Sequence, residues 1–330
     1  MICRYVSLPG CAAIFLLAGC GGGGDGGGAT VPPVGAATVI TSANAPTVAG
    51  ASVEAALQTG AIGGLTDSGG FVASATGGSV AKLDRAGTAG VISKSLRTGI
   101  SNVPIGPETS PCAVSGTVTI SGEIADPTTL TAGDRIVIDS DNCDDGEGEV
   151  VDGLLEFVID GFTPGTNAEQ LVVSVTLTVT DLMITEGEQF TTATGAMTVS
   201  IDTTNPPDTE ISISGDLFSV TTNDSSETLR NFSTVLTENA SVFPVAYTTD
   251  ASGTVESSRF DGSVTYDTPV VFQGNGEDYP FAGELLVNGA NGASVRVIAL
   301  DSVNVRVEID LDGDGAVDET IDTTWEELTA

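Results

Sequence analysis

From Cys112 to the C-terminus, hydrophobic and polar residues alternate one by one along most of the chain. Clear examples are the runs Val173–Thr180 and Met197–Ile201. Successive side chains of a β-strand point to opposite faces, so this alternation predicts antiparallel strands with one buried and one solvated face. Asn291-Gly292 is typical of a two-residue hairpin turn. The pattern therefore predicts an all-β fold, a long antiparallel meander that forms either a curled sheet or barrel or a two-sheet sandwich.

A helical periodicity occurs earlier in the chain. Val48, Ala51 and Ala55 recur at intervals of three and four residues, which predicts one short N-terminal helix over 44–58. Pro46 lies near its start, where a backbone N–H is not needed. The alanine and glycine residues of this segment predict close packing against a sheet.

The stretch after this helix is rich in Gly, Ser and Thr and is only weakly periodic. We expect irregular loops there, with short strands near Phe71–Ala75 and Gly90–Ser93. Residues 37–110 are accordingly assigned to the helix and to loops that pack on the sheet, and residues 111–330 to the antiparallel β domain.

The first 19 residues, Met1–Gly19, have the parts of an export signal. Arg4 supplies the positive end, Ala12–Leu17 forms the core of an apolar region, and small residues precede Cys20. The apolar run is too short for a spanning helix, which needs about 20 residues. We therefore expect residues 1–19 to be removed as a signal peptide.

Leu17-Ala18-Gly19-Cys20 resembles the lipobox of bacterial lipoproteins. The resemblance implies that Cys20 carries acyl chains such as palmitate and becomes the first residue of the mature chain. In that family, aspartate directly after the cysteine favours inner-membrane retention, so Gly21 implies the outer membrane. Residues 20–36 are glycine-rich and predict a flexible tether. The alternative is an ordinary cleaved signal with a chance cysteine.

The chain of 330 residues is strongly acidic, with 45 Asp and Glu against 10 Lys and Arg and a net charge of -35. Such a surface repels nucleic acid, so we expect no nucleic-acid partner. The acidity indicates either cation binding or an adaptation for solubility, for example in salty water. Both interpretations remain open at this point.

No histidine is present anywhere in the sequence. This absence excludes Ser-His-Asp and Cys-His nucleophile pairs, His-ligated zinc and His-based acid–base chemistry. Glycosidase chemistry needs two carboxylates in a cleft, and with 45 acidic residues such pairs arise by chance. We find no catalytic residues and expect a protein that is not an enzyme.

Two of the five cysteines lie in the leader and one is Cys20, which leaves Cys112 and Cys143. An even pair in an exported protein predicts a disulfide. The alternative is two free buried thiols. A redox role would favour a closer Cys-x-x-Cys spacing, which this pair lacks.

Residues 310–318 have the form D-x-D-x-D-G-x-x-D. Calcium takes six to eight hard oxygen ligands, and carboxylates at alternate positions converge when a loop wraps around an ion. A glycine in the middle permits the sharp turn. The expected ligands, all oxygen donors of this one segment, are Asp310, Asp312, Asp314, the carbonyl of Ala316, and Asp318.

This segment resembles the short calcium loops of integrin-type propeller blades and the first half of EF-hand and dockerin loops. A full EF-hand has glutamate at the twelfth position, where this chain has Ile321. The flanking residues alternate, so the loop is expected at the tip of a β-hairpin, with a structural calcium ion. The alternative is a plain acidic turn.

A second acidic cluster surrounds Cys143 but lacks the D-x-D-x-D-G order. It is interpreted chiefly as a solvated turn held by the disulfide and, as an alternative, as a metal site. Its members are Asp139, Asp141, Asp144 and Asp145, followed by Gly146.

The whole arrangement is similar to β-rich outer-membrane lipoproteins of Gram-negative bacteria, a resemblance that implies no particular activity. We expect a non-enzymatic, calcium-stabilised protein that binds or scaffolds a partner at the outer membrane, facing the periplasm or the cell surface. The membrane is contacted through the lipid anchor, and the protein or polysaccharide partner stays open. The alternatives are a carbohydrate-active hydrolase or carbohydrate-binding module, and a surface adhesin.

Overall fold

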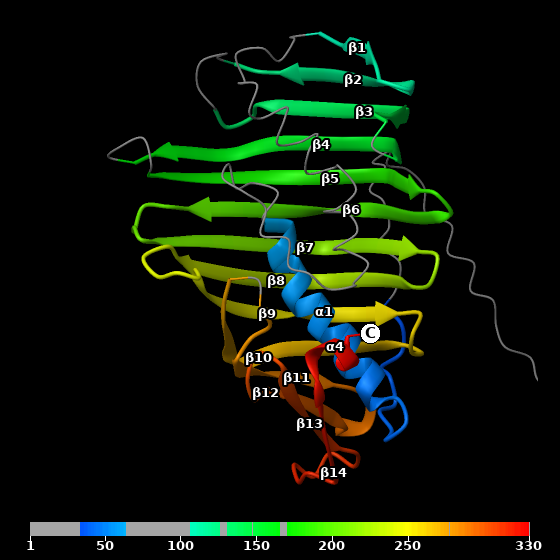
Figure 1. Ribbon diagram of the computed structural model, residues 1–330, viewed down its shortest axis with the longest axis vertical. Coiled ribbons are helices and arrows are strands. Elements are labelled where there is room, and N and C mark those ends of the chain that lie inside the picture. Colours follow the sequence, from blue (N-terminus) through cyan, green and yellow to red (C-terminus); the bar gives the residue numbers. More distant parts are fainter. Residues whose placement is uncertain are drawn as a thin grey trace, which may run out of the picture. The chain divides into compact units, whose positions relative to one another are not determined.

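An antiparallel sheet of 14 strands makes up most of the residues that the computed structural model describes, which are 34–63, 106–125, 131–146, 148–165, 170–276 and 278–329 (Figure 1). Strand order in space follows strand order in the chain, and each strand pairs with the next. The predicted all-β meander is confirmed. The sheet is open, because β1 and β14 lie at its two edges. The leader, Cys20 and the strands expected near Phe71–Ala75 and Gly90–Ser93 lie outside the described residues.

The first half of the sheet consists of β1 (Glu108–Pro111), β2 (Ser115–Glu123), β3 (Arg135–Asp144), β4 (Glu149–Pro164), β5 (Leu171–Glu186), β6 (Gln189–Asp202) and β7 (Asp208–Thr222). The second half consists of β8 (Ser226–Asn239), β9 (Ala246–Ser257), β10 (Ser263–Asn275), β11 (Ala282–Asn288), β12 (Ser294–Ala299), β13 (Asn304–Asp310) and β14 (Glu319–Thr324).

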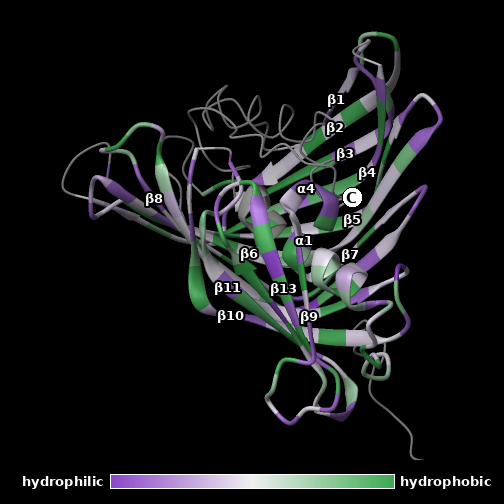
Figure 2. Cartoon of the chain, turned by 60° about the horizontal axis from the view of Figure 1, so that its bottom comes forward, coloured by the Kyte–Doolittle hydropathy of each residue, from purple (hydrophilic) through white to green (hydrophobic). Residues whose placement is uncertain are grey.

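Alternation along the strands gives the sheet one buried face. In the paired strands β12 and β13, Val295 and Val297 lie opposite Ile309 and Val307, and all four side chains are fully buried. Their neighbours along each strand point to the other face. Figure 2 shows hydrophobic and hydrophilic residues following one another along the same strands. Burial of these side chains therefore fixes the register, because a slip of one residue would expose them.

The Asn291-Gly292 turn between β11 and β12 is confirmed. Asn291 has a φ of 61° and Gly292 a φ of 84°, the left-handed conformations that a tight hairpin turn requires. Asn288 pairs with Ser294 at the start of the hairpin.

One long helix, α1 (Ala45–Gly63), lies against the sheet and contacts strands β7 to β13 (Figure 1). The expected helix over 44–58 is confirmed, and the structure extends it by five residues at its C-terminal end. Its small apolar side chains are buried, as predicted for close packing. No helix among the described residues is long and apolar enough to cross a membrane.

The short helix α4 (Trp325–Leu328) packs on α1 near the end of the chain. A Cβ atom at Gly50 would lie 2.1 Å from the carbonyl oxygen of Leu328, so only glycine permits this approach. Trp325 is fully buried, stacks on Tyr279 with ring centroids 5.5 Å apart, and donates its indole N–H to the carbonyl oxygen of Asp301. Trp325 therefore belongs to the hydrophobic core.

The segment before α1 is bound to the sheet beside β10. Ala37 forms a parallel bridge with Ser263, and the N–H of Thr38 donates to the carbonyl oxygen of Ser263 at 2.9 Å. The carbonyl oxygen of Thr38 accepts the N–H of Ala290 at 2.6 Å. This segment therefore joins the start of β10 to the turn between β11 and β12.

Bulges interrupt several strands and bend the sheet. Asn142 in β3 and Asp181 in β5 each have a φ of 47°, and the pairing register shifts at both positions. Glycines of the neighbouring strands face them: a Cβ atom at Gly116 would lie 2.0 Å from the carbonyl oxygen of Asn142, and one at Gly153 would lie 2.6 Å from that of Asp181. Bulges increase the local twist of a strand pair. Each bulge therefore depends on a glycine opposite it.

Gly153→Ala is expected to destabilise the protein by about 1 to 3 kcal/mol, because Gly153 has a φ of 120° and its hydrogen faces the bulge at Asp181. Urea unfolding monitored by the fluorescence of the single tryptophan measures the loss. Gly161→Ala in the same strand is the control, because a Cβ atom there meets no atom within 4 Å. Equal stabilities of the two variants would refute the role of Gly153.

Candidate metal site

The acidic segment of residues 310–318 forms the end of the β13–β14 hairpin. Ile309 pairs with Glu319, and the N–H of Asp318 donates to the carbonyl oxygen of Ile309 at 2.8 Å. Residues 311–318 therefore make the loop, with strands on both sides as the sequence predicts.

Carboxylates of the loop accept hydrogen bonds from the loop's own backbone. Asp310 accepts the N–H of Gly313 at 2.7 Å and that of Gly315 at 2.8 Å through its two oxygens. Asp314 accepts the N–H of Ala316 at 2.7 Å. Gly313 and Gly315 have φ values of 76° and 85°, which other residues adopt only with strain. These bonds turn the backbone around the carboxylates.

Carboxylate oxygens of Asp310, Asp312 and Asp314 lie within 4.8 Å of one another. Two oxygens that each lie about 2.4 Å from one calcium ion can be at most about 4.8 Å apart. The three carboxylates therefore lie close enough together to hold a metal ion. Asp312 and Asp314 are exposed and Asp310 is half-buried, so an ion reaches the loop directly from solvent.

The other two expected ligands are placed differently. Asp318 accepts the N–H of Leu311 at 2.8 Å across the base of the loop and is not among the three clustered carboxylates. Ala316 donates its N–H to Asp314. The ligand roles of the Asp318 carboxylate and the Ala316 carbonyl stay predictions.

The loop lies beside the β11–β12 turn and close to the segment that precedes α1. A Cβ atom at Gly313 would lie 2.8 Å from the carbonyl carbon of Gly292. Just after the loop, Glu319 accepts a hydrogen bond from the hydroxyl of Ser42 at 2.5 Å. The candidate metal site therefore lies at the end of the sheet where the described chain begins.

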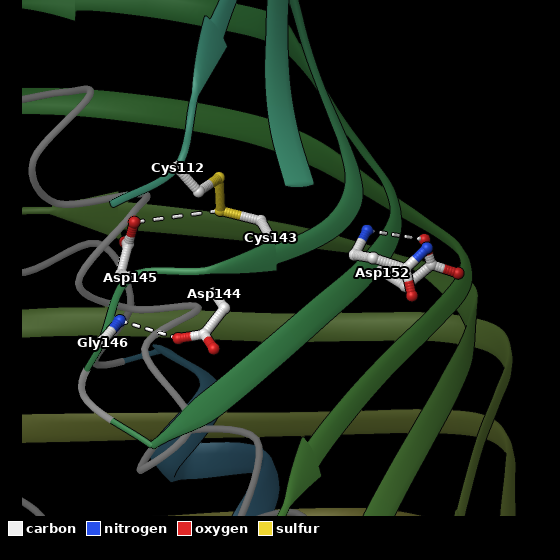
Figure 3. Close-up of a disulfide and its surroundings, with 7 residues drawn as sticks. Cys112, Cys143, Asp144, Asp145, Gly146 and Asp152 are labelled. Carbon is white, nitrogen blue, oxygen red and sulfur yellow. Dashed lines mark hydrogen bonds between the residues drawn. A yellow bond between two sulfur atoms is a disulfide. The ribbon is translucent and has the colours of Figure 1, made fainter. Parts of the chain in front are cut away.

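The expected disulfide between Cys112 and Cys143 is confirmed, with Cα atoms 5.5 Å apart (Figure 3). Cys143 lies in β3, and Cys112 directly follows β1. The bond closes a segment with a sequence separation of 31 residues and attaches the edge hairpin β1–β2 to β3.

The second acidic cluster was expected to form a turn, but Asp139, Asp141 and Asp144 lie in strand β3, and only Asp145 and Gly146 follow it. Asp144 accepts the N–H of Gly146 at 2.8 Å (Figure 3). Asp141 accepts the side-chain amide of Asn142 at 3.0 Å. The possible metal ligands that come together here are the carboxylate of Asp145 and the sulfurs of Cys112 and Cys143. Disulfide sulfurs are not thiolates, so this group is a poor metal site. The cluster is therefore the end of β3, which the disulfide joins to the residue after β1, and the short turn that follows it.

A charged cluster that sequence analysis missed lies between α1 and the sheet. Glu54 of α1 and Glu227 of β8 both bind Arg259 in the β9–β10 connection. One signal was present in the sequence, because Glu54 is the single charged residue of the helix. Its partners are about 170 and 205 residues away in the chain, so only folding brings them together.

No protein-family model matches the chain, and neither the curated proteins nor the solved structures contain a match. The geometry of the chain itself therefore carries the functional argument. Three convergent carboxylates offer hard oxygen ligands to a metal cation.

Replacement of both Cys112 and Cys143 by serine is expected to lower the free energy of unfolding by about 3 to 4 kcal/mol, because the bond restricts a loop of about 30 residues in the unfolded chain. Urea unfolding measures the total loss. Amide hydrogen exchange should show the largest loss of protection in β1 and β2. A loss below about 1 kcal/mol, or exchange that rises evenly across the sheet, would contradict this prediction.

Proposed function

We propose that this chain is a lipid-anchored extracytoplasmic protein that binds or scaffolds a partner at the outer membrane and is stabilised by a calcium ion in the 310–318 loop. The convergence of three carboxylates at the hairpin tip is the observation that carries the calcium assignment. The lipobox-like sequence at Leu17–Cys20 carries the location. No enzymatic role is part of the proposal.

Calcium suits the donor set better than other common metals. Asp310, Asp312 and Asp314 offer carboxylate oxygens, which calcium and magnesium prefer, whereas zinc usually takes nitrogen or sulfur. Magnesium demands a near-ideal octahedron and gives up its water reluctantly. An exposed, irregular loop of short side chains fits the flexible coordination of calcium more closely.

The charge balance of the sheet also favours cation binding. Five arginines supply all the basic side chains of the described residues, and every one of them forms an ion pair with a carboxylate. These ion pairs use carboxylates other than those of Asp310, Asp312 and Asp314. Repulsion among three carboxylates in one loop is relieved when a divalent cation binds between them.

The position of the loop supports a structural role. It contacts the β11–β12 turn through Gly313, and this turn binds the segment before α1 through Thr38. A calcium ion would therefore stiffen the end of the sheet at which the described chain begins.

Saturating calcium is expected to raise the thermal midpoint of the purified protein by about 5 to 10 °C, the shift for binding at about a hundredfold excess over the dissociation constant. Asp312→Asn/Asp314→Asn should abolish the shift, because two of the three clustered ligands lose their charge. Calorimetry with calcium and with chelator measures both.

The matched control is Asp144→Asn/Asp145→Asn, which removes the same charge from the second acidic cluster and should keep the full calcium shift. Magnesium at equal ionic strength should give a smaller shift. If calcium raised the thermal midpoint of wild type and of both double variants equally, the shift would come from general charge screening, and the 310–318 loop would not be a calcium site.

Cys20→Ser is expected to move the protein from the membrane fraction to the soluble fraction or to leave it unprocessed, since serine cannot accept the acyl chains. Detergent phase partition and the mass of the N-terminal peptide measure the change. Cys112→Ser is the control and should stay in the membrane fraction. If Cys20→Ser stayed in the membrane fraction, the proposed lipid anchor would be wrong, and the proposed calcium site would be unaffected by this result.

A further inference from the structure

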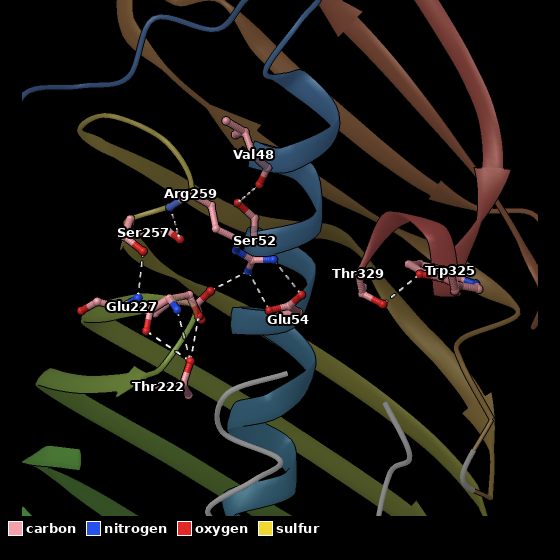
Figure 4. A network of polar contacts seen from close by, with 12 residues as sticks. Val48, Ser52, Glu54, Thr222, Glu227, Ser257, Arg259, Trp325 and Thr329 are labelled. Carbon is pink, nitrogen blue, oxygen red and sulfur yellow. Dashed lines mark hydrogen bonds and ion pairs between the residues drawn. The ribbon is translucent and has the colours of Figure 1, made fainter. Parts of the chain in front are cut away.

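Helix α1 presents one charged side chain to the sheet, that of Glu54 (Figure 4). The neighbouring residues Val53, Ala55 and Ala56 are apolar and buried. Only 6% of the Glu54 side chain is exposed to solvent. A carboxylate at such a position needs compensation by a partner, because ionised groups lose their hydration when buried.

The compensation comes from Arg259, which binds Glu54 through two parallel hydrogen bonds. Nη1 lies 3.0 Å from Oε1 and Nη2 lies 2.7 Å from Oε2. The same Nη2 also lies 2.5 Å from Oε1 of Glu227, whose side chain is 5% exposed. One guanidinium therefore serves two buried carboxylates, and the ionised cluster keeps one negative charge that Arg259 does not balance.

Burial raises the pKa of Glu54 above its ordinary value of 4.5. The hydrogen bond and charge of Arg259 act in the opposite direction, and the negative charge of Glu227 adds to the increase. The electrostatic environment of Glu54 thus consists of Arg259 from the β9–β10 connection and Glu227 from β8. Among the described residues, including those of β9, the charged groups that shift the pKa of Glu54 are Arg259 and Glu227.

A second ion pair nearby does not share this position. Arg230 of β8 binds Glu256 of β9 at 2.7 Å, and Glu256 also accepts the N–H of Gly35. Val255 points into the core, so Glu256 as the next residue of the strand points to the other face of the sheet. This pair is a natural control for the buried cluster.

We propose that the Glu54–Arg259–Glu227 cluster is a proton-responsive latch, which holds α1 to the sheet more tightly when Glu54 takes up a proton. Protonation removes the charge that Arg259 leaves unbalanced, while the ion pair between Arg259 and Glu227 persists. The latch joins the helix to strand β8 and to the β9–β10 connection. It is independent of the proposed calcium site, which lies in the β13–β14 loop.

The direction of the pH effect follows from proton linkage. Between 4.5 and the higher pKa of the folded state, the folded protein holds a proton that the unfolded chain releases. Stability contributed by this group therefore increases as the pH falls through the folded-state pKa, and the gain is complete below the unfolded-state pKa. One proton changes the unfolding constant by up to about tenfold per pH unit.

The test compares wild type, Glu54→Gln and Glu256→Gln as purified mature proteins between pH 8 and pH 5 at constant ionic strength. Urea unfolding followed by Trp325 fluorescence supplies the unfolding constant at each pH. Between pH 8 and pH 5, the contribution of Glu54 should lower the unfolding constant of wild type and of Glu256→Gln by up to about tenfold for each unit that the pH falls. This contribution should be absent from Glu54→Gln. Identical slopes in wild type and Glu54→Gln would overturn the proposal.

A second measurement stands even if Glu54→Gln fails to fold. Carbon-13 NMR of a sample labelled at glutamate side-chain carboxyls should show one carboxyl that titrates above the ordinary range in wild type. Its midpoint should fall in Glu227→Gln, since the like charge disappears and Arg259 becomes free to serve Glu54 alone. The absence of any such carboxyl, or a midpoint that does not move, would overturn the latch.

Discussion

Close packing of α1 against a bent sheet is the constraint on which the rest of the structure depends. The helix contacts strands from β7 to β13, so a single element holds together the second half of the meander. Alanine, glycine and valine on the helix permit this approach, and Gly50 lets the carbonyl oxygen of Leu328 lie where a side chain would otherwise be. Bulges opposite Gly116 and Gly153 add twist elsewhere in the same sheet. Small residues thus permit both the close approach of the helix and the bulges in the first half of the sheet.

Charge is distributed in two ways in this molecule. Arginines neutralise selected carboxylates, and the buried cluster at Arg259 shows how far one guanidinium is shared between two of them. At the β13–β14 loop, backbone N–H groups are the partners of the carboxylates instead. A carboxylate oxygen that accepts one backbone hydrogen bond keeps a further lone pair for a cation. The same acidic composition therefore supports a buried ion cluster in one place and a candidate metal site in another.

Much of the candidate metal site could be predicted from the order of residues 310–318. Alternate aspartates separated by glycines close into a loop through local bonds, so neighbours in the chain are neighbours in space. The role of Asp318 was harder to predict, because its hydrogen bond to Leu311 depends on the register of β13 and β14. The Glu54 cluster could not be predicted from the sequence, because Arg259 follows Glu54 by 205 residues and no local pattern connects the two.

The sequence by itself determined most of the strands, the helix, the hairpin turn at Asn291-Gly292 and the pairing of Cys112 with Cys143, although β1 begins in the segment expected to form loops. Each of these depends on local periodicity, turn chemistry or the count of available partners. Only the tertiary structure decided that the sheet stays open and that α1 lies against β7 to β13. Closure, helix placement and ion pairing depend on accumulated twist and on contacts between distant residues. Period-two alternation is the same for an open sheet, a closed one and a sandwich, so it carries no information about these choices.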